Sequence, residues 1–204
     1  MQTNSLNTTP QIATDNSQIL TAIQTLLDKA DKGKHVIVAV DGRCGSGKSS
    51  FAQAIKNTYA CNVFHMDDYY LPMDKRKDNW EKINGGNMDF ERFKEEILMP
   101  LRQGVAVMYR PYDCHIGAYK SCEKMEPCML AVVEGSYSAH PLLADAYDMK
   151  IFLTCSKEIQ TRRLKEREGE HYSAFEQKWI PMEESYFKNF NIQQHSDIVL
   201  DTGV

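Results

Sequence analysis

The chain has 204 residues, of which 42% are hydrophobic and 25% charged, which fits one globular domain with a buried core. Its net charge of −4 argues against a broad nucleic-acid-binding surface. No apolar run approaches the about 20 residues that a membrane-spanning helix needs, so no membrane partner is expected. The six cysteines form no CxxC pattern and the N-terminus has no secretion signal. Reduced thiols and a cytoplasmic protein are therefore predicted.

Apolar periodicity divides the chain into helices and strands. Polar residues 1–16 predict a disordered tail, and residues 17–204 predict a single domain. Residues 17–33 have apolar side chains at helical spacing, and Gly33 is the expected stop. Residues 35–40 form an unbroken, mainly β-branched run, typical of a strand buried on both faces. Similar short runs recur at residues 61–66, 105–109, 129–134 and 149–153 and, more weakly, at 197–202.

Helical patterns lie between these runs, at residues 49–60, 89–104, 156–170 and 173–190. In the last of them Pro181 predicts a kink or a break. Strands that alternate with helices predict crossover connections, and therefore an α/β fold with a mainly parallel sheet and helices on both faces. The long polar stretch 71–88 contains a Gly-Gly pair and predicts an irregular excursion near the active edge.

The stretch "VAVDGRCGSGKSS" contains the pattern G-x-x-x-x-G-K-[ST] of a phosphate-binding P-loop, between a predicted strand and a predicted helix. The glycines allow a tight loop whose N–H groups approach phosphate oxygens, and the helix N-terminus favours anions. Lys48 is expected to reach the β- and γ-phosphates, and the Ser49 hydroxyl to bind Mg²⁺. ATP and Mg²⁺ are the predicted cofactors. The predicted cofactor-binding residues are Gly42, Arg43, Cys44, Gly45, Ser46, Gly47, Lys48, Ser49 and Ser50. Cys44 is interpreted as a spacer, with a redox-sensitive thiol as the alternative.

Carboxylates follow two further predicted strands. Glu134 ends the run 129–134, and an acid there, beside a P-loop, predicts a role in the Mg²⁺ shell. The alternative is an exposed strand-end carboxylate. Asp67 follows the run 61–66. Ligands bind beyond the carboxyl ends of parallel strands, so Asp67 is expected near the γ-phosphate, where it would accept a proton and touch the metal shell.

The stretch "FHMDDYYLP" places aromatic and acidic side chains together. Tyr69 and Tyr70 are interpreted as a wall that stacks on, or hydrogen-bonds, a flat or sugar-like acceptor. The alternative is that an aspartate caps a helix and that the tyrosines belong to the core.

Six motifs occur in one order: "GRCGSGKSS", "HMDDYYLP", "NW" before a "DF" helix, "YRPYDC", "VVEGSYS" and an Arg-rich helix. In this set the chain resembles the uridine kinase/phosphoribulokinase family of P-loop kinases, nearest its uridine kinase-like members, over about residues 36–202. The resemblance implies a P-loop NTPase fold with a small lid at about residues 157–175. It also implies transfer of the γ-phosphoryl group of ATP to the 5′-OH of uridine or cytidine, in nucleoside salvage. The alternatives are a kinase for another nucleoside or a pantothenate-like alcohol, and a nucleotide-binding regulatory switch. Such proteins often form homo-oligomers.

The resemblance also implies site roles. Asp67 matches the catalytic base, Tyr70 an acceptor-side aromatic and Glu81 the acid that holds the ribose hydroxyls. Tyr112 and Asp113 match the segment that lines the nucleobase pocket, and His115 is either a base contact or an ordinary loop histidine. The implied metal ligands are Ser49, Asp67 and Glu134. The implied catalytic cations are Lys48, Arg162, Arg163 and Arg167, the last two sharing one helical face. Three departures from the family pattern put uridine itself in question as the acceptor: Glu81 in place of an aspartate, Gly85-Gly86 in place of a His-Pro turn, and Cys114 in place of an aromatic residue.

Overall fold

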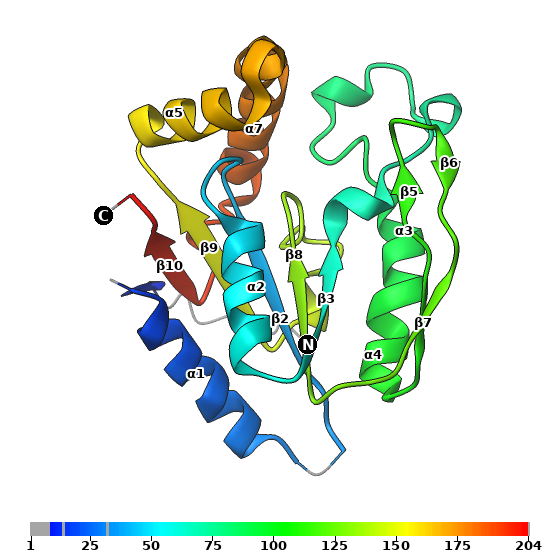
Figure 1. Cartoon of the computed structure of the whole chain (residues 1–204), viewed down its shortest axis with the longest axis vertical. Helices are drawn as coiled ribbons and strands as arrows, with labels where there is room; N and C mark the ends of the chain where they lie inside the picture. Colours follow the sequence, from blue (N-terminus) through cyan, green and yellow to red (C-terminus); the bar gives the residue numbers. More distant parts are fainter. Residues whose placement is uncertain (1–8, 14, 32, 204) are drawn as a thin grey trace, which may run out of the picture.

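The structure is a computed structural model that describes residues 9–13, 15–31 and 33–203. Its centre is a six-stranded sheet with the order β1-β10-β9-β2-β8-β3, in which every neighbouring pair is parallel (Figure 1). The strands are β1 (Gln11–Ala13), β2 (Val36–Gly42), β3 (Cys61–His65), β8 (Leu130–Glu134), β9 (Met149–Thr154) and β10 (Ile198–Asp201). This arrangement confirms the predicted α/β fold with a mainly parallel sheet.

Helices cover both faces of the sheet, as Figure 1 shows. On one face lie α1 (Asn16–Lys29) and α2 (Lys48–Thr58), and on the other lie a helical stretch at residues 90–103 and α7 (Ile180–Phe190). The stretch 90–103 consists of α3 (Phe90–Phe93), the π-helical η4 (Lys94–Leu98) and α4 (Met99–Gln103). Successive residues of β2 alternate between the two apolar cores, because side chains of a strand point to opposite faces. Burial on both faces therefore explains the unbroken apolar run in the sequence.

The segment after β3 is irregular, as predicted for residues 71–88. It contains three short 3₁₀ turns, η1 (Met66–Tyr69), η2 (Met73–Lys75) and η3 (Trp80–Lys82). We call residues 71–88 the excursion.

Two antiparallel strand pairs lie outside the central sheet. They are β4 (Val107–Tyr109) with β7 (Glu123–Met125), and β5 (Tyr112–Asp113) with β6 (Ala118–Tyr119). The apolar run 105–109 was expected to form a strand of the central sheet, but its residues 107–109 form β4, which pairs with β7 outside that sheet. Val107 and Tyr109 are buried while Met108 between them is exposed, which is the alternation of a strand with only one covered face.

The C-terminal helices run in sequence. They are α5 (Lys157–Glu168), the 3₁₀ turn η6 (Gly169–His171), α6 (Tyr172–Ala174), the π-helical η7 (Phe175–Trp179) and α7. Pro181 is the second residue of α7, and the π-helical η7 ends two residues before it. At the predicted kink or break the chain therefore changes from a π-helix to an α-helix. The helical run continues into the proline because the π-helical turn before it has a wider hydrogen-bond pattern, in which the Ile180 N–H donates to the Phe175 carbonyl.

The N-terminal prediction needs correction. Gln11–Ala13 form β1, an edge strand on β10, and α1 begins at Asn16, so the predicted tail 1–16 is not wholly unstructured. Its residues 1–8 and 14 lie outside the described residues. The Asp15 carboxylate caps α1 by accepting the N–H groups of Ser17 and Gln18. The helix ends at Lys29, before the expected stop at Gly33. In the part of the chain that the structure describes, no helix is long and apolar enough to cross a membrane.

Candidate nucleotide and acceptor site

The predicted phosphate loop, residues 42–49, connects β2 to α2 at the carboxyl edge of the sheet. Gly45 and Gly47 have φ values of +76° and +88°, which side chains rarely adopt, so the loop needs glycine at both positions. Lys48 opens α2, and its Nζ donates to the carbonyls of Gly42 at 2.7 Å and Arg43 at 3.1 Å. The Lys48 ammonium group therefore contacts the phosphate loop.

Glu134 meets the loop from the neighbouring strand β8. The Ser49 hydroxyl donates to Glu134 Oε1 at 3.1 Å, so two of the predicted metal ligands are in contact. His65, at the end of β3, pairs in register with Glu134, and its Nδ1 lies 2.5 Å from the same oxygen. This hydrogen bond is the main reason why the pKa of His65 is raised. His65 could not be selected from the sequence, because its pairing with Glu134 follows only from the strand order.

The donor set fits Mg²⁺ held together with a nucleotide. Mg²⁺ usually takes one or two protein carboxylates and completes its shell with phosphate oxygens and water. The Ser49 hydroxyl and the Glu134 carboxylate supply ligands of this kind. Across residues 9–13, 15–31 and 33–203, no three His, Cys, Asp or Glu side chains are grouped to hold a metal by themselves. The residues therefore suit an ion that arrives with phosphates.

Asp67 lies just beyond β3, in η1. Water reaches this residue, but the surrounding protein weakens its hydration and raises the pKa of its carboxyl group. The Tyr70 hydroxyl donates to Asp67 Oδ1 at 2.8 Å, and this bond together with the charge of Lys48 opposes the rise. A carboxylate that is readily protonated and open to solvent is suited to accept a proton from a hydroxyl group.

The two tyrosines of "DDYY" have different environments. Tyr69 is fully buried and meets the ring of Phe93 edge to face at a centroid distance of 4.9 Å. The acceptor-wall interpretation is therefore wrong for Tyr69, which belongs to the core. Asp68 accepts a hydrogen bond from the hydroxyl of Tyr109. Of the pair, only Tyr70 contacts Asp67, because the 3₁₀ turn directs the neighbouring side chains differently.

The excursion contacts the C-terminal helices. The Glu81 carboxylate accepts a hydrogen bond from Lys178 Nζ at 2.7 Å. Trp80 is buried, and its ring centroid lies 6.2 Å from that of Trp179. Glu81 was predicted to hold ribose hydroxyls. Here its carboxylate connects the excursion to η7, the helical turn before α7.

The predicted nucleobase segment is the hairpin of β5 and β6. The ring of Tyr112 is buried against Tyr119, at a centroid distance of 5.2 Å. The Asp113 carboxylate accepts the N–H of His115 at 2.9 Å, which lowers the pKa of Asp113, and the His115 side chain is exposed. The negative charge of Asp67 acts on the Cys114 thiol, although burial does more to raise its pKa. The hairpin is thus within electrostatic range of Asp67, while Tyr112 and Asp113 interact within it.

The three lid arginines differ in their surroundings. Arg163 donates to the Gly45 carbonyl of the loop at 3.2 Å and to the Thr202 carbonyl at 2.8 Å. Arg167 pairs with its neighbour Glu168, and Arg162 is exposed. Arg163 and Arg167 lie four residues apart in α5 and so share one face of the helix, as predicted, although their side chains have different partners. Of the three side chains, only Arg163 touches the phosphate loop.

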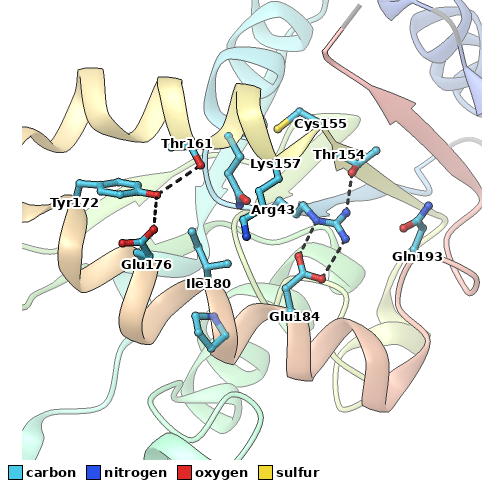
Figure 2. A pocket seen from close by; sticks show the side chains of 12 residues that line it. Arg43, Thr154, Cys155, Lys157, Thr161, Tyr172, Glu176, Ile180, Glu184 and Gln193 are labelled. Carbon is cyan, nitrogen blue, oxygen red and sulfur yellow. Dashed lines mark hydrogen bonds and ion pairs between the residues drawn. The ribbon is translucent and has the colours of Figure 1, made fainter.

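A cavity of about 690 Å³ lies between α5 and α7. Figure 2 shows the side chains that line it. Arg43 of the loop extends into it, where its Nε donates to Glu184 and its Nη1 to Thr154, both at 2.7 Å. The Arg43 side chain thus ties the loop to α7 and β9. Cys44, the next residue, is buried, and burial raises the pKa of its thiol, which opposes the redox-sensitive alternative.

Two acids of the site were not predicted. Asp41 directly precedes the loop and accepts hydrogen bonds from the N–H groups of Gly42 and Ala139 and from the Tyr186 hydroxyl. Burial raises the pKa of Asp41 to about 6. Its position before the first glycine was visible in the sequence, but its partners were not. The second acid, Glu183 on α7, accepts the N–H of Cys44 at 2.9 Å, and nothing in the sequence placed that helix over the loop.

Comparison with known proteins agrees with this geometry. Residues 37–200 match the sequence profile of the "Phosphoribulokinase / Uridine kinase family". A phosphoribulokinase of Synechocystis is 28% identical over 134 residues, which cover 61% of this chain but only 39% of that enzyme. A solved structure of a proposed uridine kinase from Bacillus stearothermophilus aligns with a TM-score of 0.67 at 18% identity, covering 90% of this chain and 100% of that one. A proposed fructose transport system kinase from Silicibacter aligns with a TM-score of 0.71 at 20% identity, covering 92% and 99%.

The parallel sheet, the P-loop and the acids at the ends of the neighbouring strands are those of a P-loop kinase. Because the family profile matches most of its length, the chain belongs to the phosphoribulokinase/uridine kinase family.

Proposed function

We propose that this protein uses Mg²⁺ and ATP to phosphorylate the 5′-OH of uridine or cytidine, in nucleoside salvage. The observation that carries the proposal is Asp67, an open carboxylate with a raised pKa at the same sheet edge as Lys48, Ser49 and Glu134. In open α/β sheets this edge is where substrates bind. The six cysteines are all free, which supports a reducing compartment, so we place the activity in the cytoplasm.

On the donor side, the loop amides and Lys48 would bind the phosphates. Ser49 and Glu134 would hold Mg²⁺, which neutralises charge on the phosphate oxygens when bound, and Asp67 is proposed to border that shell. The segment of about residues 157–175 would act as the lid. Arg163 already touches the loop, whereas Arg162 and Arg167 would have to turn toward the phosphates as the lid closes.

On the acceptor side, Asp67 would accept the proton of the attacking hydroxyl group, with Tyr70 fixing the carboxylate by its hydrogen bond. Glu81 would bind ribose hydroxyls after leaving Lys178, and the hairpin with Tyr112, Asp113 and His115 would border the base.

Ion pairing supports an uncharged acceptor over a phosphorylated sugar. A sugar phosphate needs cations that are not neutralised by protein acids. Three cations around this site are paired with acids: Lys178 with Glu81, Lys120 with Asp113 and Arg110 with Glu96. Arg76 is the exception, because its guanidinium donates to the Leu71 carbonyl and lies over the Trp80 ring. A nucleoside, which carries no phosphate, makes no such demand.

The test is Mg-ATP-dependent ADP production across an acceptor panel: uridine, cytidine, adenosine, fructose, ribulose 5-phosphate, pantothenate and no acceptor. Stimulation by uridine or cytidine is expected. Stimulation by ribulose 5-phosphate or fructose alone would support the kinase activity but refute a nucleoside as the acceptor. Slow ADP release that no acceptor stimulates would favour the alternative of a nucleotide-binding switch.

A further inference from the structure

Glu183 places a buried carboxylate against the phosphate loop. Only 6% of this residue is exposed. Its Oε2 accepts the backbone N–H of Cys44 at 2.9 Å, and its Oε1 accepts the hydroxyl of Ser136. Ser136 also lies 3.4 Å from Lys48 Nζ, so the acid, the hydroxyl and the loop lysine form one chain. The helix α7 thus provides an anion to a loop whose amides are suited to bind phosphate.

A bound triphosphate would compete with this carboxylate. Both are anionic acceptors for the same amide, and two negative charges repel strongly where water is scarce. The negative charge of Glu183 also acts on other groups of the site. It is the second-largest cause, after burial, of the raised pKa values of Cys44 and Tyr137. A nucleotide that fills the loop therefore has to displace the Glu183 carboxylate from the Cys44 amide.

The same helical run also reaches the acceptor side. Trp179 lies one turn before Glu183 and packs on Trp80 of the excursion, while Lys178 bonds Glu81. A shift of α7 that frees the loop amide would therefore move the contacts that hold Glu81. The donor loop and the proposed ribose acid are joined through about six residues of one helical run.

We propose that Glu183 is a positioning residue of the donor site: it holds the Cys44 amide until a nucleoside triphosphate takes that amide, and its release shifts α7 against the excursion. The inference rests on the nucleotide binding contained in the proposed function, but not on the identity of the acceptor.

Tryptophan fluorescence can follow this exchange, because the chain has two tryptophans and both belong to the Trp80–Trp179 pair. A non-hydrolysable ATP analogue and ADP are titrated, each with Mg²⁺ and without acceptor. In the wild type, the analogue is expected to change the emission. In Glu183→Gln, which removes the competing charge, it should bind more tightly, on the order of tenfold, with a smaller emission change. The gain should be smaller for ADP, which carries less charge.

Glu176→Gln is the matched control. It removes one carboxylate from the same helical run, and in the structure this carboxylate contacts Tyr172 and not the loop. Its affinity and emission change should equal those of the wild type. If Glu183→Gln does not fold, as judged by circular dichroism, Glu183→Asp shortens the side chain instead and should also bind the analogue more tightly.

Wild-type affinity and an unchanged emission response in the folded Glu183 variant would refute the inference and leave the kinase proposal intact. A wild-type protein that binds neither nucleotide would refute both. Tighter binding confined to the Glu183 variant would support the inference, because a purely structural role would lower stability without selecting triphosphate over diphosphate.

Discussion

At the residue scale, Asp67 carries the proposed chemistry. Its carboxylate is open to solvent and accepts a hydrogen bond from the Tyr70 hydroxyl. The surrounding protein raises the pKa of this carboxyl group. An asparagine of the same shape keeps a hydrogen-bond acceptor but cannot take up the proton. Asp67→Asn is therefore expected to retain nucleotide affinity and to lose about 10²–10⁴-fold in phosphoryl transfer. Calorimetric titration and coupled ADP release measure the two quantities, and parental turnover would remove Asp67 as the base.

His140 provides a prediction about pH. It is buried, stacks on Phe90 at a centroid distance of 4.2 Å, and desolvation lowers its pKa to about 4. The unfolded chain binds this proton near pH 6.5, so between pH 6.5 and 4 the unfolded state holds more protons and acid destabilises the fold. The loss should total roughly 3 kcal/mol at the lower end.

Urea unfolding at several pH values measures this effect. His140→Phe keeps an aromatic ring at the position but cannot titrate, so its free energy of unfolding should fall less between pH 6.5 and 4. Equal slopes for the two proteins would show that other groups cause the acid sensitivity.

At the scale of elements, the junction of β2 with the phosphate loop has the strictest steric demand. Gly42 has a φ of +140°, and a Cβ there would lie 2.0 Å from the Leu153 carbonyl oxygen of β9. Since a strand backbone cannot yield as a side chain can, Gly42→Ala should destabilise the fold by at least about 3 kcal/mol.

Gly33→Ala is the matched control for this prediction. Gly33 has a φ of +86° with no atom within 4 Å of the added Cβ, so only the backbone strain of about 1–2 kcal/mol applies. Denaturant unfolding of both variants separates steric conflict from strain, and an equal loss of stability would contradict the close approach of β9.

The whole molecule joins a donor site on the sheet edge to an acceptor region built from the excursion and the hairpin. If the loop binds Mg-ATP, ligand at about 100 times its Kd adds about 2.7 kcal/mol to stability. For a chain of this size, Tm should then rise by about 5–10 °C. Thermal unfolding with Mg-ATP, with ATP plus EDTA, and with Lys48→Ala measures the effect. EDTA should reduce the rise and Lys48→Ala should remove most of it. A full rise in Lys48→Ala would contradict the assignment of the loop.

Local sequence determined the class of this protein. The glycines, Lys48 and Ser49 had to follow a buried strand, and the alternation of apolar runs with helical patterns left a parallel sheet as the consistent fold. Asp67 and Glu134 could be selected because strand ends at one edge of a parallel sheet meet at one site. These features depend on neighbours in the chain and on a general rule of topology.

Only the tertiary structure decided which polar groups meet. His65 and Glu134 share a register that requires the order of β3 and β8, and Tyr69 enters the core because a 3₁₀ turn directs it there. Glu183 reaches the loop from a helix 139 residues along the chain, and only the structure distinguishes Arg163 from the other two lid arginines as the one that contacts the loop. Such contacts depend on how α5 and α7 pack over the sheet edge, and no periodicity or motif in the sequence encodes that distance.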